Sequence, residues 1–141
     1  MAAAGTQVQA AGLVKYTVVE HPSIPESLTK GDPVRGRAAV INRQKGNCLA
    51  CHSIPEIPEE QFHGEVGPVL DDVGSRMSAG EIRMRIVDPK VINPETAMPS
   101  FYKLEGLHRV AKKWQGKTIL SAQEVEDVVA YMLTLKGSYS N

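Results

Sequence analysis

The chain has 141 residues, a length that suits one domain with a core of its own. Sixteen basic residues balance sixteen acidic ones, so the formal net charge is zero and the positive charge that attracts nucleic acid or an anionic membrane is missing. No apolar run approaches the roughly 20 residues that a membrane-spanning helix needs. Aromatic residues make up only 5%, which favours a helical aliphatic core over a β-sandwich. The sequence therefore predicts no nucleic-acid partner and no membrane partner.

Residues 1–30 are the least patterned part of the chain. They are rich in small and polar residues, include Pro22 and Pro25, and show only a short apolar alternation between Leu13 and Val19. Prolines and a weak period-2 pattern are typical of extended chain, with room for a short strand. We therefore expect an extended N-terminal arm over residues 1–30, in front of one domain over residues 31–141.

The first expected helix begins at Asp32. Asp is a favoured N-cap residue, and Pro33 then occupies the first helical position, where its missing N–H costs nothing. The helix is expected to run to about residue 44, because Gly46 accepts the left-handed conformation that closes helices. Within it, Gly36 predicts a close crossing with the last helix, with Tyr131 beside the glycine.

The motif that follows this helix carries the clearest chemistry in the chain. Cys48-Leu49-Ala50-Cys51-His52 places two thiols where they can add to the two vinyl groups of one haem, and an imidazole where it can reach the iron. The sequence therefore predicts one covalent haem c, bonded to Cys48 and Cys51, with His52 as an iron ligand.

Two other uses of a Cys-x-x-Cys pair need features that this sequence lacks. A thioredoxin-like redox pair belongs in a βαβ setting, and the strands of that fold are not predicted. Half of a zinc site needs a second pair of ligands, and the chain has only these two cysteines. We therefore favour covalent haem over both alternatives.

Two later helices carry the capping-box pattern, in which a Ser caps the helix and a Glu three residues on reaches back. One is expected from Ser78-Ala79-Gly80-Glu81 to Asp88, where Pro89 ends it. The other begins at Ser121-Ala122-Gln123-Glu124 and gathers its apolar residues on one face: Val125, Val128, Val129, Met132 and Leu133. Residues 53–74 and 90–103 are expected to be irregular, so the predicted fold is all-α around a ligand.

The sixth iron ligand decides whether such a haem transfers electrons or binds small molecules. Met98 lies between Pro94 and Pro99, where non-helical chain can present a thioether to the other haem face. We predict Met98 as this ligand, and a closed Met and His pair favours an electron carrier. His63 is the alternative. The other candidates are Met77, Met84, Met132, His21 and His108; Met84 and Met132 fit the helical core, and His21 and His108 suit a solvated surface.

Two further residues are candidates for supporting roles. Gly67-Pro68 can place a backbone carbonyl against His52 Nδ1–H, which would fix the imidazole tautomer and raise its donor strength. A plain loop turn explains the dipeptide equally well. Trp114 can donate its indole N–H to a haem propionate or lie half-buried at the surface.

With these residues identified, the chain resembles the SoxX family, the monohaem subunits of the SoxAX cytochromes of bacterial sulfur oxidation. The resemblance covers about residues 31–135 and rests on the haem motif and three further segments: Gly64–Pro68, Asn93–Tyr102 around Met98, and Gly116–Ser121 leading into Val128–Tyr131. The fold it implies is a class I cytochrome c-like domain wrapped around one covalent haem, with its first and last helices crossing near the haem.

The resemblance also implies a function. It implies a periplasmic heterodimer with a SoxA-like subunit, which would hold the active site of an L-cysteine S-thiosulfotransferase and join thiosulfate to a cysteine of a SoxYZ-like carrier. This chain would accept the released electrons and pass them to an acceptor cytochrome c. Both of its cysteines would be thioethers, so it would supply no catalytic nucleophile. The start of the sequence lacks the family's signal peptide, so export is expected from the resemblance alone.

Two other functions remain as alternatives: a free-standing soluble monohaem carrier, and a haem with an open or exchangeable sixth site. Charge gives one further indication of partners, since acids follow the haem motif and bases follow the Met98 segment. Opposed patches can steer electron-transfer partners, although a solvated face is the commoner role. The acids are Glu56, Glu59, Glu60, Glu65, Asp71 and Asp72, and the bases are Lys103, Arg109, Lys112, Lys113 and Lys117.

Overall fold

The computed structural model describes residues 13–14, 16–20, 23–25 and 27–137. In chain order its elements are α1 (Pro33–Ile41), η1 (Cys48–Ala50), α2 (Val73–Arg76), α3 (Ala79–Val87), η2 (Pro89–Val91), η3 (Lys112–Trp114) and α4 (Ala122–Met132), where η marks a 3-10 turn. The only β pairing in this part of the chain is an isolated bridge between Val19 and Ser23. The predicted all-α class is confirmed. None of these helices is long and apolar enough to cross a membrane.

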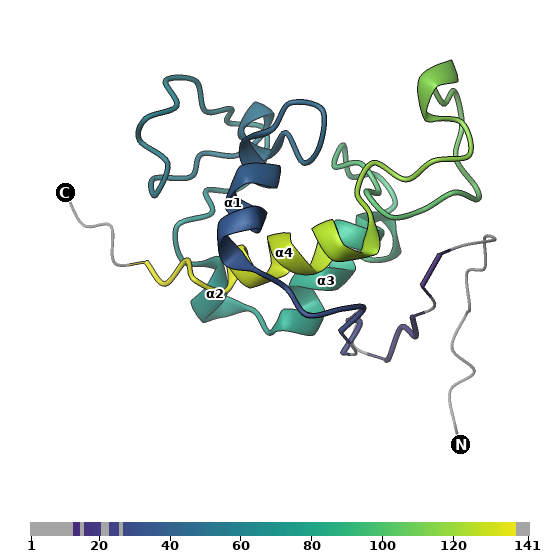
Figure 1. Cartoon of the computed structure of the whole chain (residues 1–141), viewed down its shortest axis with the longest axis horizontal. Helices are drawn as coiled ribbons and strands as arrows, with labels where there is room; N and C mark the ends of the chain where they lie inside the picture. The colour runs from purple at the N-terminus through teal and green to yellow at the C-terminus, as the bar shows by residue number, and fades with distance from the viewer. Residues whose placement is uncertain (1–12, 15, 21–22, 26, 138–141) are drawn as a thin grey trace.

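The crossing of α1 and α4 is the central contact of the fold (Figure 1). A Cβ atom on Gly36 would lie 1.8 Å from the carbonyl oxygen of Asp127 and 2.8 Å from the Cβ of Tyr131, so only glycine allows this approach. The crossing predicted from Gly36 is therefore present, with Tyr131 beside it.

The Asp127 side chain holds the start of α1 against α4. Its Oδ1 accepts the backbone N–H of Asp32 at 2.8 Å, and its Oδ2 accepts Arg35 Nε at 2.8 Å. Burial alone would raise the pKa of Asp127, but hydrogen bonds from Arg35, Gln123 and Asp32 together hold that pKa below its usual range. The carboxylate therefore stays ionised where it joins the two helices.

The helix caps agree with the sequence-based predictions, but the C-terminal end of α1 does not. Asp32 accepts the N–H groups of Val34 and Arg35, and both predicted capping boxes are formed. However, α1 ends at Ile41, before the expected residue 44. Asn42 turns into extended backbone and its side chain accepts the Gln44 N–H at 2.8 Å, a local bond that competes with the helix.

The short helix α2 was not predicted, and it begins at the end of the segment, residues 53–74, that was expected to be irregular. It is fixed by contacts with the end of the chain, because the Gly74 N–H donates to the Leu135 carbonyl at 2.8 Å. A Cβ on Gly74 would lie 2.5 Å from the Leu133 carbonyl oxygen. Four residues are too few for a helical period, so a tertiary contact decides this element.

A buried ion pair connects α3 to α4 and to the arm. Arg83 and Glu126 have side chains only 2% and 3% exposed, and the guanidinium donates two hydrogen bonds of 2.7 Å to the carboxylate. A third bond, 2.6 Å long, runs from Arg83 to the Ile24 carbonyl. Because every buried donor is paired, the desolvation cost of both charges is offset.

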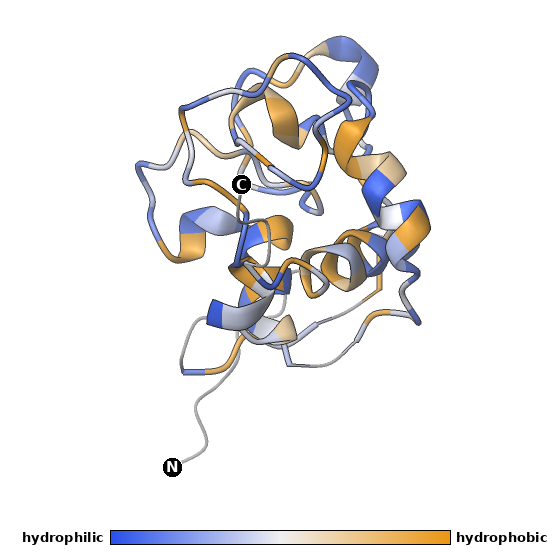
Figure 2. Ribbon diagram, turned by 90° about the vertical axis from the view of Figure 1, so that its left-hand side faces the viewer, coloured by the Kyte–Doolittle hydropathy of each residue, from blue (hydrophilic) through white to orange (hydrophobic). Residues whose placement is uncertain are grey.

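Two long segments extend from this helical core. Residues 53–72 lie on one side of the crossed helices and residues 103–119 project on the other (Figure 1). The helices carry both apolar and polar turns (Figure 2), and their apolar residues meet in one buried cluster that includes Val40, Met84 and Val125. The helices thus form the core, and the long segments are free to enclose a site.

The α1–α4 crossing can be tested with Gly36→Ala. Alanine normally stabilises a helix relative to glycine, but its methyl group would overlap the Asp127 carbonyl here, so we expect roughly 2 kcal/mol of destabilisation. Urea unfolding followed by circular dichroism measures this. Val34→Ala, at an α1 position that is 78% exposed, is the control and should change stability little. A Gly36→Ala protein as stable as the parent would show that the helices can separate freely.

Candidate haem site

The cysteine motif begins as soon as the chain leaves α1. Asn47 adopts the left-handed conformation, with φ of 48°, and starts the turn η1. The N–H groups of Cys51 and His52 then both donate to the Cys48 carbonyl, at 3.1 and 2.9 Å. This single tight turn gathers both thiols and the imidazole on one wall of a cavity.

The environment of Cys48 does not favour a thiolate. Burial of the thiol, with a further contribution from Cys51, raises the pKa of Cys48 to about 12. Redox-active Cys-x-x-Cys pairs and zinc ligands work as thiolates at lowered pKa. The thiol of Cys48 thus differs from that of a redox-active pair. Both cysteines are free and line the cavity together, and no group of three metal-ligating side chains occurs among the residues that the structure describes.

His52 is oriented by the Gly67-Pro68 segment. Its Nδ1 lies 2.6 Å from the Pro68 carbonyl oxygen, and a carbonyl can only accept, so Nδ1 carries the proton. This leaves the lone pair of Nε2 for a metal. The Gly67 N–H donates to the Cys51 carbonyl at 2.7 Å, which ties this segment to the motif.

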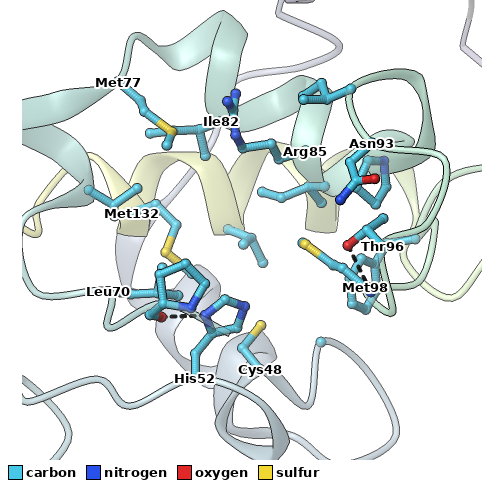
Figure 3. Close-up of a pocket in the computed structure, with 18 of the residues that line it drawn as sticks. Cys48, His52, Leu70, Met77, Ile82, Arg85, Asn93, Thr96, Met98 and Met132 are labelled. Atoms are coloured by element: carbon cyan, nitrogen blue, oxygen red, sulfur yellow. Dashed lines mark hydrogen bonds between the residues drawn. The ribbon is translucent and has the colours of Figure 1, made fainter. Parts of the chain in front are cut away.

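Met98 lies in the irregular segment between η2 and Phe101. The segment is ordered by short-range bonds: Lys90 Nζ donates to the Thr96 carbonyl at 2.6 Å, and the Met98 N–H donates to Thr96 Oγ1 at 3.2 Å. Figure 3 shows the thioether of half-buried Met98 pointing into the cavity, on a different wall from His52 and Cys48. The structure thus brings together all five predicted site residues: Cys48, Cys51, His52, Pro68 and Met98.

The space between these walls consists of two adjoining cavities of about 280 and 440 Å³, both lined by Cys48, His52 and Met98. Pockets that hold cofactors usually measure roughly 300–1,000 Å³. Most of the remaining lining is apolar and comes from α2, α3, α4 and the segments between them: Leu70, Val73, Ile82, Ile86, Phe101, Leu120, Val128 and Met132. Such a site suits a large flat apolar group that carries a metal.

Comparison with known proteins agrees with this geometry. The family model for cytochrome c matches residues 34–136. The chain belongs to the cytochrome c family. Among solved structures, this cytochrome is similar to a chain in the crystal structure of SoxXA from P. pantotrophus, with 35% sequence identity and a TM-score of 0.78, over 86% of this chain and 94% of that one. It is therefore a SoxX-like cytochrome with the class I fold and covalent haem c. No curated protein matches it significantly.

The residues of this cytochrome fit a covalently bound haem. A Cβ on Gly67 would lie 2.3 Å from His52 Cε1, so the glycine leaves room for the imidazole to stand in the cavity. Both cysteines line that cavity beside His52. The apolar walls would bury the ring, and the imidazole would offer it an unprotonated nitrogen.

The remaining candidate ligands can now be compared with their expected positions. His63, the alternative to Met98, accepts the Ile54 N–H at Nδ1 and lies 3.0 Å from the Ile57 carbonyl at Nε2, so both ring nitrogens are bonded within its own loop. Met84 and Met132 are both buried in the core, as expected, and Met132 also lines the cavity, as Met77 does. His108 is exposed, and His21 lies outside the described residues.

Trp114 and the charged residues lie at the edges of the site. Trp114 lines the cavity on the side of the cysteines, with Lys113 Nζ 5.5 Å from its ring centre. Among the acids, Glu56 and Glu59 pair with Arg37, and Asp72 pairs with Arg76. Part of the predicted acidic patch is thus neutralised within the chain.

Several cavity residues were not predicted from the sequence. Ile82, Arg85 and Ile86 line the cavity from α3, and their i, i+3, i+4 spacing was the signal that could have placed them on one face. Asn93 and Thr96 line it from the Met98 segment, where no period exists to reveal them. The helical wall could have been predicted, but the irregular wall could not.

The cradle for His52 can be tested with Gly67→Ala. The added methyl would overlap the imidazole and push it off the Pro68 carbonyl, so we expect several-fold less haem-loaded protein and about 2 kcal/mol lower stability in what remains. Haem content by pyridine haemochrome and urea unfolding measure both. Val69→Ala, at a nearby position that is 47% exposed and lines neither cavity, is the control. Normal loading of Gly67→Ala would contradict the close contact.

Proposed function

We propose that this SoxX-like cytochrome is the electron-transfer subunit of a SoxAX-type complex, with His52 and Met98 as its iron ligands. The observation that supports this most directly is the cavity, in which an imidazole and a thioether project from different walls beside two cysteines. A closed pair of ligands keeps the iron coordination unchanged when its charge changes, and this is the property that an electron carrier needs.

Each residue of the site has a separate task in this proposal. Cys48 and Cys51 hold the ring by thioether bonds, and Pro68 keeps the proton of His52 on Nδ1 so that Nε2 faces the iron. Met98 supplies the sixth ligand and thereby excludes water and small molecules from it. When bound, haem c supplies a one-electron couple between ferric and ferrous iron.

The proposed partner is a SoxA-like subunit. SoxXA is a solved structure that this cytochrome resembles. Both cysteines here are needed for haem attachment, so the catalytic cysteine chemistry belongs on the partner. We infer that thiosulfate is joined there to a SoxYZ-like carrier in the periplasm. Electrons would leave through this subunit to an acceptor cytochrome c.

Substitution of Met98 tests the ligand. In Met98→Leu the isosteric side chain cannot coordinate iron, so the Met-to-iron charge-transfer band of the oxidised protein should disappear, and carbon monoxide should bind the reduced protein readily. Optical spectra of the purified cytochrome measure both changes. Met77→Leu and Met132→Leu are matched controls, because these methionines line the same cavity and should keep the band. A band that survives in Met98→Leu but is lost in a control would move the ligand to that methionine.

The partner is tested by co-expression with a tagged SoxA-like cytochrome. We expect the two chains to co-purify as a one-to-one heterodimer and to be reduced by thiosulfate only when a SoxYZ-like carrier is present. Size-exclusion chromatography with light scattering gives the stoichiometry. If the present chain stayed monomeric beside a correctly folded SoxA-like protein, the free-standing carrier would replace the subunit.

A further inference from the structure

A second buried carboxylate, Asp88, lies next to the segment that carries Met98. It follows the last residue of α3 directly, and its side chain is only 5% exposed. Asp88 lines neither cavity, so it has no direct contact with the haem site. A carboxylate is rarely buried without several partners, because the desolvation cost of the charge must be offset. The hydrogen-bond partners of Asp88 therefore indicate its structural role.

The Asp88 carboxylate accepts hydrogen bonds from three directions. Its Oδ1 accepts Ser100 Oγ at 2.8 Å and the Lys90 backbone N–H at 3.3 Å. Its Oδ2 accepts Lys103 Nζ at 2.7 Å, and the Lys103 side chain is itself 21% exposed. One buried group thus contacts three residues that follow it in the sequence.

These partners lie at the two ends of the segment that holds Met98. Lys90 begins this segment within η2, and Ser100 and Lys103 end it. Beyond Ser100, the chain is held to the end of α3 by backbone bonds, from Phe101 to the Ile86 carbonyl at 3.0 Å and from Tyr102 to the Val87 carbonyl at 3.3 Å. Asp88 therefore closes the base of the loop that presents the thioether.

The arm covers this group from outside. The Val14 N–H donates to the Tyr102 hydroxyl at 2.7 Å, and Tyr16 is 6% exposed. The pKa of Tyr16 is raised to about 12, first by burial and then by the charges of Asp88 and Tyr102. Tyr16 therefore stays neutral next to Asp88, and Lys103 is the cation that balances the carboxylate.

We propose that Asp88 is a positioning residue, which holds the Met98 segment closed through Ser100, Lys90 and Lys103 and so determines how firmly Met98 stays on the iron. The inference rests on Met98 as the sixth ligand. A thioether is a weak donor to ferric iron, so its coordination depends on how far the protein restricts the alternatives. His52 differs, because Cys51, the residue directly before it, is an attachment point that would restrain it covalently.

The test replaces Asp88 with Asn and measures ligand exchange on the oxidised haem-loaded cytochrome. Asparagine keeps the shape and can still accept from Ser100, but it loses the charge-assisted bond to Lys103. Imidazole is the probe, since it binds ferric iron only when Met98 leaves. We expect imidazole to bind about tenfold more tightly to Asp88→Asn, the change that follows from loss of one such bond. The charge-transfer band should also disappear at a lower temperature than the helical signal.

Glu126→Gln is the matched control. It neutralises another buried carboxylate that is paired with a cation, but Glu126 contacts Arg83 on the far side of α3 and not the Met98 segment. It should lower the temperature of global unfolding and leave the imidazole affinity near that of the parent. Ser100→Ala and Lys103→Met remove single partners of Asp88 and should each weaken Met98 retention. If Asp88→Asn fails to fold, the imidazole affinities of these two variants provide the test instead.

The outcomes separate this inference from the proposed function. Unchanged imidazole affinity in Asp88→Asn, with the band of Met98 present, would overturn the positioning role and leave the ligand intact. An equal shift in Glu126→Gln would also overturn it, because the effect would then be one of general stability. If the parent protein lacked the charge-transfer band, the ligand assignment would fail, and this inference with it. If Asp88→Glu kept the imidazole affinity of the parent, the result would support the carboxylate as the group that holds the Met98 segment.

Discussion

The contact between Gly36 and the backbone of Asp127 determines how this domain encloses its site. Because α1 lies directly on α4, the turn that leaves α1 brings Cys48 and His52 to a cavity whose floor includes Val128 and Met132 of α4. A side chain at residue 36 would separate the two helices and shift the haem motif, which follows α1, relative to the α4 wall of the cavity. Packing at a distance from the haem motif therefore fixes the motif against its wall.

The remaining walls depend on polar contacts across the chain. Arg83 and Glu126 join α3 to α4, and two of the α3 residues that line the cavity, Ile82 and Ile86, lie on either side of Arg83 in the sequence. The ion pair is buried and has all its hydrogen bonds, so it favours one relative placement of the two helices. The apolar cluster supplies the stability, and these charged contacts specify the geometry.

The sequence predicted those features whose causes are local. The N-cap of Asp32 and both Ser–Glu capping boxes formed where expected, because each depends on residues within one turn. The attachment motif is equally local. The short helix α2 was missed because a tertiary contact, with Leu135, sets it. One local feature was missed as well: α1 ends early, at Ile41, where the side chain of Asn42 bonds the chain that follows.

In the haem site, too, features with local causes were predicted and features set by tertiary contacts were not. The carbonyl of Pro68 was a candidate because the dipeptide Gly-Pro is conspicuous, and the structure places it 2.6 Å from His52 Nδ1. Asp88 was interpreted only as the residue before a proline, a helix terminator, which it is. Nothing in the local pattern revealed its bonds to Ser100 and Lys103, because the chain must fold back before these residues meet.

The two proposed iron ligands are held by different physics, and this difference has a consequence for how the cytochrome can fail. His52 adjoins a covalent attachment point and donates to a carbonyl that is tied to the motif by backbone bonds. Met98 reaches the cavity on a loop whose restraint is noncovalent throughout. Local opening of such a loop costs less than unfolding of the core, because few apolar contacts are lost. Loss of Met98 from the iron should therefore precede any loss of His52, and the groups that close the loop base decide when it occurs.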